Sequence, residues 1–157
     1  MRFMPILCIC TSLLMPLTAY AAGTSSSGGA SDKSEYSYTS SAMKAANKLI
    51  KAKDYTAAAE TLNTEVMRNP DDADAWNLLG FSLRKSGQFA EAEVAYETAL
   101  SLDPKHTRAM EYMGELYLSL NQLEKAEALL ARLNALCSFN CKDRDMLKKA
   151  IAAYKAN

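Results

Sequence analysis

Two cysteines, Cys137 and Cys141, form the sharpest local chemical feature of this 157-residue sequence. Three interpretations of the pair are open: a structural disulfide, a copper(I) site and a redox-active thiol pair. A disulfide closing this short loop would contribute roughly 2 kcal/mol and is typical of exported chains. Copper(I) carriers usually add a His or Met ligand, and Met146 is near in sequence. Lys142 follows Cys141 where covalent haem attachment requires histidine, and the spacing is not C-x-x-C.

No catalytic constellation surrounds the single histidine, His106. It follows Pro104 in a turn, and nothing in the sequence places a nucleophile and an orienting carboxylate beside it. We therefore expect His106 to be a surface turn residue. Asp71, Asp72 and Asp74 stand at the start of an expected helix, where acidic side chains cap free amides and complement the helix dipole. Phosphate-loop, zincin and dinucleotide motifs are absent from the sequence, which predicts a protein that is not an enzyme and has no cofactor or metal.

A 34-residue sequence repeat predicts the helices that position the cysteine pair, His106 and the acidic residues. Its central copy, 73–106, has large and small side chains at fixed places: Trp76, Leu79, Gly80, Leu83, Ala92, Tyr96, Ala99 and Pro104. Small residues are needed where two helices cross closely, so we expect Gly80 to lie against Ala92. A proline cannot continue a helix and ends the second one. The pattern resembles the tetratricopeptide repeat (TPR).

The same pattern recurs on both sides of the central copy. Pro70 and Pro104 occupy the same position in successive copies, and so do Gly80 and Gly114. We expect Gly114 to lie against Ala126. The three units cover 39–72, 73–106 and 107–140. The resemblance implies an all-α fold, a right-handed superhelical TPR solenoid of three helix-turn-helix repeats with a C-terminal capping helix.

Both ends of the solenoid depart from the central pattern. In the first unit Ala42, Ala45 and Ala46 stand where Trp, Leu and Gly would be typical, so its first helix should pack less deeply. After the third unit, apolar residues recur at helical spacing over 143–155, with Asp143 as the expected N-cap. This capping helix would cover the last apolar face and complete a TPR domain over 39–157.

The segment 1–21 is typical of a secretory signal peptide. Arg2 precedes the apolar stretch Phe3–Leu17, and small residues at Ala19 and Ala21 suit a signal peptidase that cuts after Ala21. An uncleaved membrane anchor and a lipoprotein are the alternatives, and the uncleaved segment would be the chain's one contact with a membrane. The segment 22–38 is rich in Ser and Gly, which indicates a flexible linker.

Charge excludes some partners. The chain has 18 basic and 18 acidic residues, and loss of Arg2, the single charged residue of 1–21, would change the net charge from 0 to −1. A basic stripe with interleaved aromatic residues is absent from the sequence, so nucleic acid is not expected as a partner. No small-molecule substrate is indicated either.

Partner binding is the main functional expectation. In TPR proteins the first helix of each unit lines a concave groove, and the resemblance implies these groove residues: Asn47, Lys51, Asn77, Phe81, Arg84, Arg108, Glu111 and Glu115. An aromatic anchor such as Phe81, flanked by amides and charges, suits a protein or peptide partner. Asn47 and Arg108 also match a carboxylate-clamp pattern, but Met43 stands where that pattern has a lysine, so we do not infer recognition of a C-terminal carboxylate. The alternative is that these residues form only a solvated face.

Three strings, Glu111–Tyr117, Cys137–Cys141 and Lys148–Tyr154, resemble small exported TPR proteins of proteobacteria, which implies a periplasmic location. The leading hypothesis is a non-enzymatic periplasmic module that binds a partner protein or peptide in its concave groove. The first alternative is a copper-handling or thiol-redox protein that uses Cys137 and Cys141. Self-assembly through the alanine-rich first unit is a further alternative.

Overall fold

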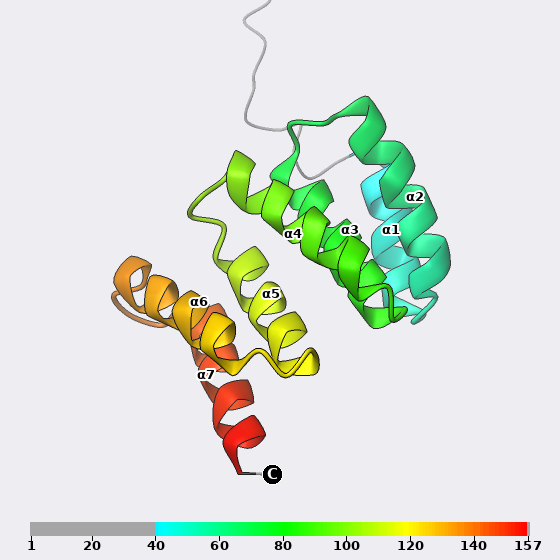
Figure 1. Ribbon diagram of the computed structural model, residues 1–157. Helices are drawn as coiled ribbons and strands as arrows, with labels where there is room; N and C mark the ends of the chain where they lie inside the picture. The colour runs from blue at the N-terminus through cyan, green and yellow to red at the C-terminus, as the bar shows by residue number, and fades with distance from the viewer. Residues whose placement is uncertain (1–39, 157) are drawn as a thin grey trace, which may run out of the picture. The chain divides into compact units, whose positions relative to one another are not determined.

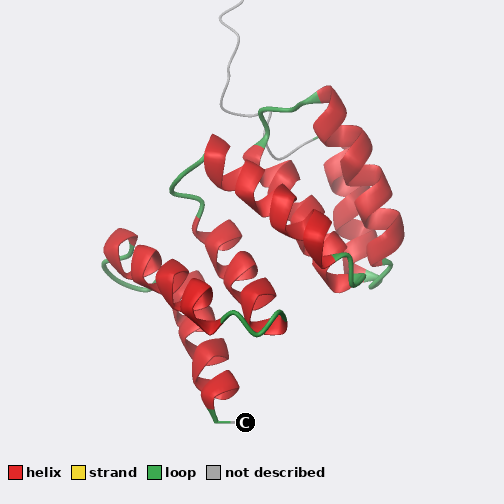
Figure 2. Cartoon of the chain, in the orientation of Figure 1, coloured by secondary structure: helices red, strands yellow, loops and turns green. Residues whose placement is uncertain are grey.

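The structure, a computed structural model, describes residues 40–156. The expected signal peptide (1–21) and linker (22–38) lie outside the described residues. The described part folds into α-helices and contains no strand (Figures 1 and 2). The helices are α1 (Ser41–Lys51), α2 (Tyr55–Arg68), α3 (Ala73–Lys85), α4 (Phe89–Leu102), α5 (Thr107–Ser119), α6 (Leu123–Leu136) and α7 (Lys142–Lys155). The all-α prediction is therefore confirmed.

The turns inside the three helix pairs repeat the same backbone conformation. Lys53, Gly87 and Asn121 stand at the same position of successive units and have φ angles of 62°, 85° and 58°. The left-handed region is free of a Cβ penalty only for glycine, and asparagine tolerates it better than most residues. These tight turns make each pair antiparallel, so α1, α3 and α5 run in one direction and end at a common edge.

Side chains close the N-termini of the first three helices. The Ser40 hydroxyl accepts from the amide of Met43 at 3.0 Å, the Asp54 carboxylate accepts from that of Ala57 at 3.2 Å, and the Asp72 carboxylate accepts from that of Ala75 at 3.0 Å. Such caps satisfy amides that have no partner inside the helix. Burial raises the pKa of Asp72, while the hydrogen bond from Ala75 opposes that shift.

The start of α7 differs from the prediction. Its N-cap is Cys141, not Asp143, which lies in the first turn. Asp143 instead accepts a hydrogen bond from the hydroxyl of Thr107 at 2.6 Å. Its carboxylate thus joins the starts of α7 and α5, and no side chain caps the first amides of α7.

Two buried clusters hold the helices together. One lies among α1 to α4 and the other among α4 to α7, where Leu147 and Ile151 of α7 are buried at 0% and 5% exposure. Helix α7 packs beside both α5 and α6 (Figure 1), so it covers the last apolar face. Helix α1 buries only Met43 and Ala46.

The two helical glycines have neighbours that the sequence did not predict. A Cβ atom at Gly80 would lie 2.7 Å from ring carbons of Tyr96, and one at Gly114 would lie 2.5 Å from a methyl carbon of Leu147. Tyr96 and Leu147, and not the expected Ala92 and Ala126, supply the atoms nearest to these two positions. A large side chain fills the space left by each missing Cβ, because a close-packed core leaves no such void.

None of the helices within 40–156 combines the length and the apolar character needed to cross a bilayer.

Candidate partner-binding site

Three aromatic rings from different helices meet on the face formed by α3 and α5. The Phe81 ring of α3 lies 4.8 Å from that of Tyr112 on α5 and 6.0 Å from that of Tyr55 on α2, measured between ring centroids. All three residues are half-buried. We call Tyr55, Phe81 and Tyr112 the aromatic floor. The exposed parts of their rings are apolar surface that a partner could contact.

Arg84 is fixed beside this floor. Its Nη2 lies 2.7 Å from Glu115 Oε2, and its side chain is only 9% exposed. The guanidinium carbon lies 5.7 Å from the ring centroid of Phe81 and 5.9 Å from that of Tyr112. Ion pairing and cation–π attraction thus hold one cation in place, and Arg84 is not available to pair with a partner's carboxylate.

A buried polar layer lies among α3, α4 and α5. Asn77, Tyr96 and Glu111 are 2%, 0% and 1% exposed. Among the described residues, no hydrogen-bond partner is found for Asn77 Oδ1, Arg84 Nε, Tyr96 Oη or Glu111 Oε1. Four such atoms in one region are unusual, because buried polar groups are normally paired. Asn77 and Glu111 therefore lie beneath the surface instead of facing a partner.

Glu111 has the most perturbed carboxyl group of this layer. Burial raises its pKa to about 8, and the neighbouring Glu115 adds to the shift, while the Arg84 guanidinium opposes it. A carboxyl group in this environment is largely protonated at neutral pH. The layer therefore holds one ion pair, Arg84 with Glu115, and one neutral acid.

The remaining predicted groove residues lie outside this cluster. Asn47 is exposed, and its side-chain amide donates to the carbonyl of Met43 at 2.9 Å. Lys51 is exposed at the end of α1. The Arg108 side chain is 58% exposed and lies 4.0 Å from Asp143 of α7. The structure thus brings together Phe81, Arg84, Glu111 and Glu115, and directs Arg108 towards α7.

Sequence reasoning missed two of the three floor residues. It took only the repeat positions that line the groove in TPR proteins, and neither Tyr55 nor Tyr112 occupies one of them. Tyr112 stands beside Glu111 in α5, and Tyr55 opens α2 directly after the first turn. A search for aromatic residues adjacent to groove positions and to helix starts would have found both.

His106 is not the surface residue that we expected. Its Nδ1 accepts from the amide of Ala109 at 3.2 Å and so caps α5, and its Nε2 lies 3.2 Å from Asp74 Oδ1. The His106 side chain is only 11% exposed. The contact ties the start of α5 to the start of α3, a neighbour that no local pattern could predict.

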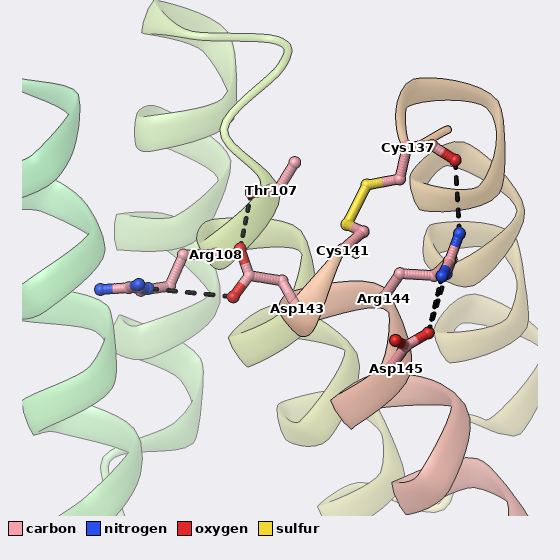
Figure 3. Close-up of a disulfide and its surroundings, with 7 residues drawn as sticks. All are labelled: Thr107, Arg108, Cys137, Cys141, Asp143, Arg144 and Asp145. Atoms are coloured by element: carbon pink, nitrogen blue, oxygen red, sulfur yellow. Dashed lines mark hydrogen bonds and ion pairs between the residues drawn. A yellow bond between two sulfur atoms is a disulfide. The ribbon is translucent and has the colours of Figure 1, made fainter. Parts of the chain in front are cut away.

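The cysteine pair forms a disulfide between α6 and α7 (Figure 3). Arg144 of α7 donates to the carbonyl of Cys137 at 3.3 Å, which adds a second link across the loop. Phe139, inside the loop, is 91% exposed. No group of three or more metal-ligating side chains occurs within residues 40–156.

A pocket that sequence reasoning did not anticipate lies between α4 and α6, over α5. It has a volume of about 440 Å³. Its lining includes Leu100, Met113 and Leu129, with the charged residues Glu97 and Arg132 among the others. It is formed largely by the second helices of units two and three, whereas the aromatic floor is carried mainly by first helices.

Comparisons with known proteins settle the family. Two family models, both described as tetratricopeptide repeat, match residues 43–80 and 83–136. The chain belongs to the tetratricopeptide repeat family. The matches cover most of α1 to α6, and the fold is accordingly an all-α TPR superhelix.

Individual TPR relatives are distant. The uncharacterized protein ycf37 of Pyropia yezoensis is 32% identical over 83 residues, which is 53% of this chain and 46% of that protein. The cytochrome c-type biogenesis protein CcmH of Escherichia coli is 28% identical over 107 residues, 60% of this chain and 31% of that protein. The chain spans less than half the length of the curated relatives it matches.

A solved structure supports the fold. The first TPR of Spaghetti (RPAP3), bound to the HSP90 peptide SRMEEVD, aligns with a TM-score of 0.64. The alignment covers 74% of this chain and 91% of that chain at 22% identity. At this identity the likeness shows the fold alone.

Proposed function

We propose that this chain is a non-enzymatic protein-interaction module that binds a peptide segment of a partner protein on the aromatic floor. One observation carries the proposal: Phe81 and Tyr112 stack at 4.8 Å and remain half-exposed, while Arg84 and Glu115 fix each other beside them. Aromatic side chains in a pre-organised setting are the usual anchors of protein interfaces. That a TPR structure of the same fold was solved with a bound peptide is consistent with this use.

The test is a selection of random dodecapeptides displayed on phage against the full chain as purified after export. Phe81→Ser removes the centre of the aromatic floor. Phe139→Ser is the matched control, because it makes the same change at a 91% exposed phenylalanine in the disulfide loop. We expect peptides that bind the parent and the Phe139→Ser variant but lose at least about tenfold in affinity to the Phe81→Ser variant. Equal binding to all three proteins, with all three folded by circular dichroism, would reject the proposal.

We further propose that the module works in the periplasm after cleavage behind Ala21. The basic start, the apolar stretch and the small residues at the cleavage position support this. Cell fractionation and N-terminal sequencing check it: the expected mature chain begins at Ala22 and is released with the periplasmic fraction.

The thiol alternative is a second candidate. Cys137 and Cys141 are joined in a loop at the surface, and the chain is similar to a protein named for cytochrome c-type biogenesis. A free-thiol count on protein from the periplasm, followed by copper(I) titration, decides it. A fully oxidised pair that resists mild reductants argues for a purely structural disulfide.

A further inference from the structure

Two polar contacts mark the ends of the pocket between α4 and α6. At one end, Lys125 of α6 places its Nζ 3.5 Å from Oε1 of Glu93 on α4. At the other end, the Arg132 guanidinium of α6 donates to the carbonyl of Pro104, just after α4, at 3.3 Å. The pocket lining on α4 comes from residues between Glu93 and Pro104, and the lining on α6 runs from Lys125 to Arg132. The two contacts therefore frame a site of about 440 Å³, which we call the α4–α6 pocket.

The inner surface of the α4–α6 pocket is largely apolar. Met113 and Tyr117 of α5 and Leu129 of α6 line it and are otherwise buried, and we call these three residues the pocket base. The Tyr117 ring centroid lies 4.7 Å from the Nζ of Lys125, so this cation is held by the ring and by the Glu93 carboxylate together. A pocket of this volume with an apolar base and few polar groups is typical of a small-molecule site.

Glu97 differs from the other charged residues that line this pocket. Lys125 and Arg132 are both engaged in the contacts at its ends, whereas within the described part of the chain the Glu97 carboxylate has neither an ion pair nor a hydrogen bond. Burial raises the pKa of the Tyr117 phenol, and the carboxylates of Glu93 and Glu97 raise it further. The charge of Glu97 therefore lies close to the pocket base. Its α4–α6 pocket neighbours offer apolar contacts but no cation that is still unengaged.

We propose that the α4–α6 pocket binds a small organic cation, an amine with an apolar body, whose ammonium group pairs with Glu97 while the apolar part lies on the pocket base. A charged hydrogen bond to a carboxylate beside apolar surface is stronger than one in open water. The competing ligand is an organic anion held by Arg132, whose guanidinium already donates to a carbonyl. The site is formed largely by second helices, so it is separate from the aromatic floor and goes beyond the proposed peptide binding.

The test compares three compounds that share one skeleton: phenylbutylamine, phenylbutanoate and phenylbutanol. Each is titrated into the full chain as purified after export, with isotope-labelled methionine methyl groups observed by NMR. The Met113 methyl group reports on the pocket base, and Met43 of α1 is the internal control, because it lies in another helix pair. We expect the amine to shift the Met113 signal saturably, with a dissociation constant on the order of 1 mM, and the acid and the alcohol to bind at least about fivefold more weakly.

Two variants test the role of the carboxylate. Glu97→Gln should weaken binding of the amine about fivefold and leave the affinity for the alcohol unchanged. Glu91→Gln makes the same change at an exposed glutamate of α4 that does not line the pocket, and it should bind the amine as the parent does. The proposal is overturned if the amine gives no saturable Met113 shift up to about 20 mM. It is also overturned if the acid binds as tightly as the amine, or if Glu97→Gln binds the amine as tightly as Glu91→Gln.

Discussion

Units two (73–106) and three (107–140) carry glycine at the same repeat position, but the two glycines admit different neighbours. Gly80 makes room for the Tyr96 ring from the second helix of its own unit, whereas Gly114 makes room for Leu147 from α7. The repeat therefore specifies where a small residue is needed without specifying which side chain will fill the space. That side chain depends on the residues of the next helices along the solenoid.

The two units also differ at the position occupied by Asn77 in unit two and by Glu111 in unit three. Both residues are buried, at 2% and 1% exposure. Asn77 cannot titrate, whereas the carboxyl group of Glu111 must be protonated or carry a buried charge. Unit three thus contains a pH-sensitive group where unit two has a neutral amide.

Replacing Glu111 should have the largest effect of the changes considered, because it removes the pH-dependent stability that distinguishes unit three from unit two. Its pKa is about 8 in the folded protein, against an ordinary value of 4.5 that we take for the unfolded chain. Below pH 4.5 the Glu111 carboxyl group is protonated in both the folded and the unfolded chain, and its contribution to the free energy of unfolding is fully present. As pH rises towards 8, the unfolded chain releases a proton that the folded chain retains, so the free energy of unfolding falls, by on the order of 3 kcal/mol. Urea unfolding between pH 5 and pH 8 should show this decline in the parent and much less in Glu111→Gln. Parallel pH profiles for the two proteins would contradict the assigned pKa.

Opening the disulfide should have the next largest effect. Unit two has Pro104 after its second helix, whereas the chain after the second helix of unit three is closed into a loop by Cys137 and Cys141. In the double variant Cys137→Ser/Cys141→Ser, the unfolded chain regains the entropy of a short loop, so we expect the free energy of unfolding to fall by about 2 kcal/mol. Urea titration measures it. A reducing agent serves as the control. It should lower the free energy of unfolding of the parent by as much as the double substitution does, and it should leave the double variant unchanged. If the reductant destabilised the double variant as well, its effect on the parent could not be assigned to the disulfide.

The smallest effect should distinguish the two glycines. Alanine gains about 1 kcal/mol of helix propensity over glycine at either position. At Gly80 this gain is outweighed because the rigid Tyr96 ring must shift, so Gly80→Ala should destabilise by about 1.5 kcal/mol. At Gly114 the added methyl meets the flexible end of Leu147, so Gly114→Ala should destabilise by only about 0.5 kcal/mol. Thermal unfolding of both variants checks the order, and a larger loss for Gly114→Ala would show that Leu147 cannot move.

Much of the fold was predictable because its signals are local. The regular recurrence of Lys53, Gly87 and Asn121 marks turns that all adopt positive φ, and Asp72 caps α3 as expected. The start of α7 was not predicted correctly, since Asp143 bonds to Thr107, at the start of a helix much earlier in the chain. A capping preference depends only on neighbouring residues, so it cannot predict that Thr107 binds the Asp143 carboxylate.

The candidate site was predictable only in part. Repeat positions led to Phe81, Arg84 and Glu115, which lie together. They did not indicate that Tyr112 completes the floor or that Arg84 is held by Glu115. Those facts depend on how two first helices approach each other, which the repeat alone does not set.

The sequence by itself determined the helices, their pairing and the order of the units, because turn conformations, caps and the spacing of small and large residues act over a few neighbouring positions. The tertiary structure alone decided which groups are buried, which charges are paired and what lies opposite each glycine. The physical reason is that side chains from separate units must fill one shared interior, and the pKa of Glu111, the place of His106 beside Asp74 and the fixed Arg84 all follow from that packing.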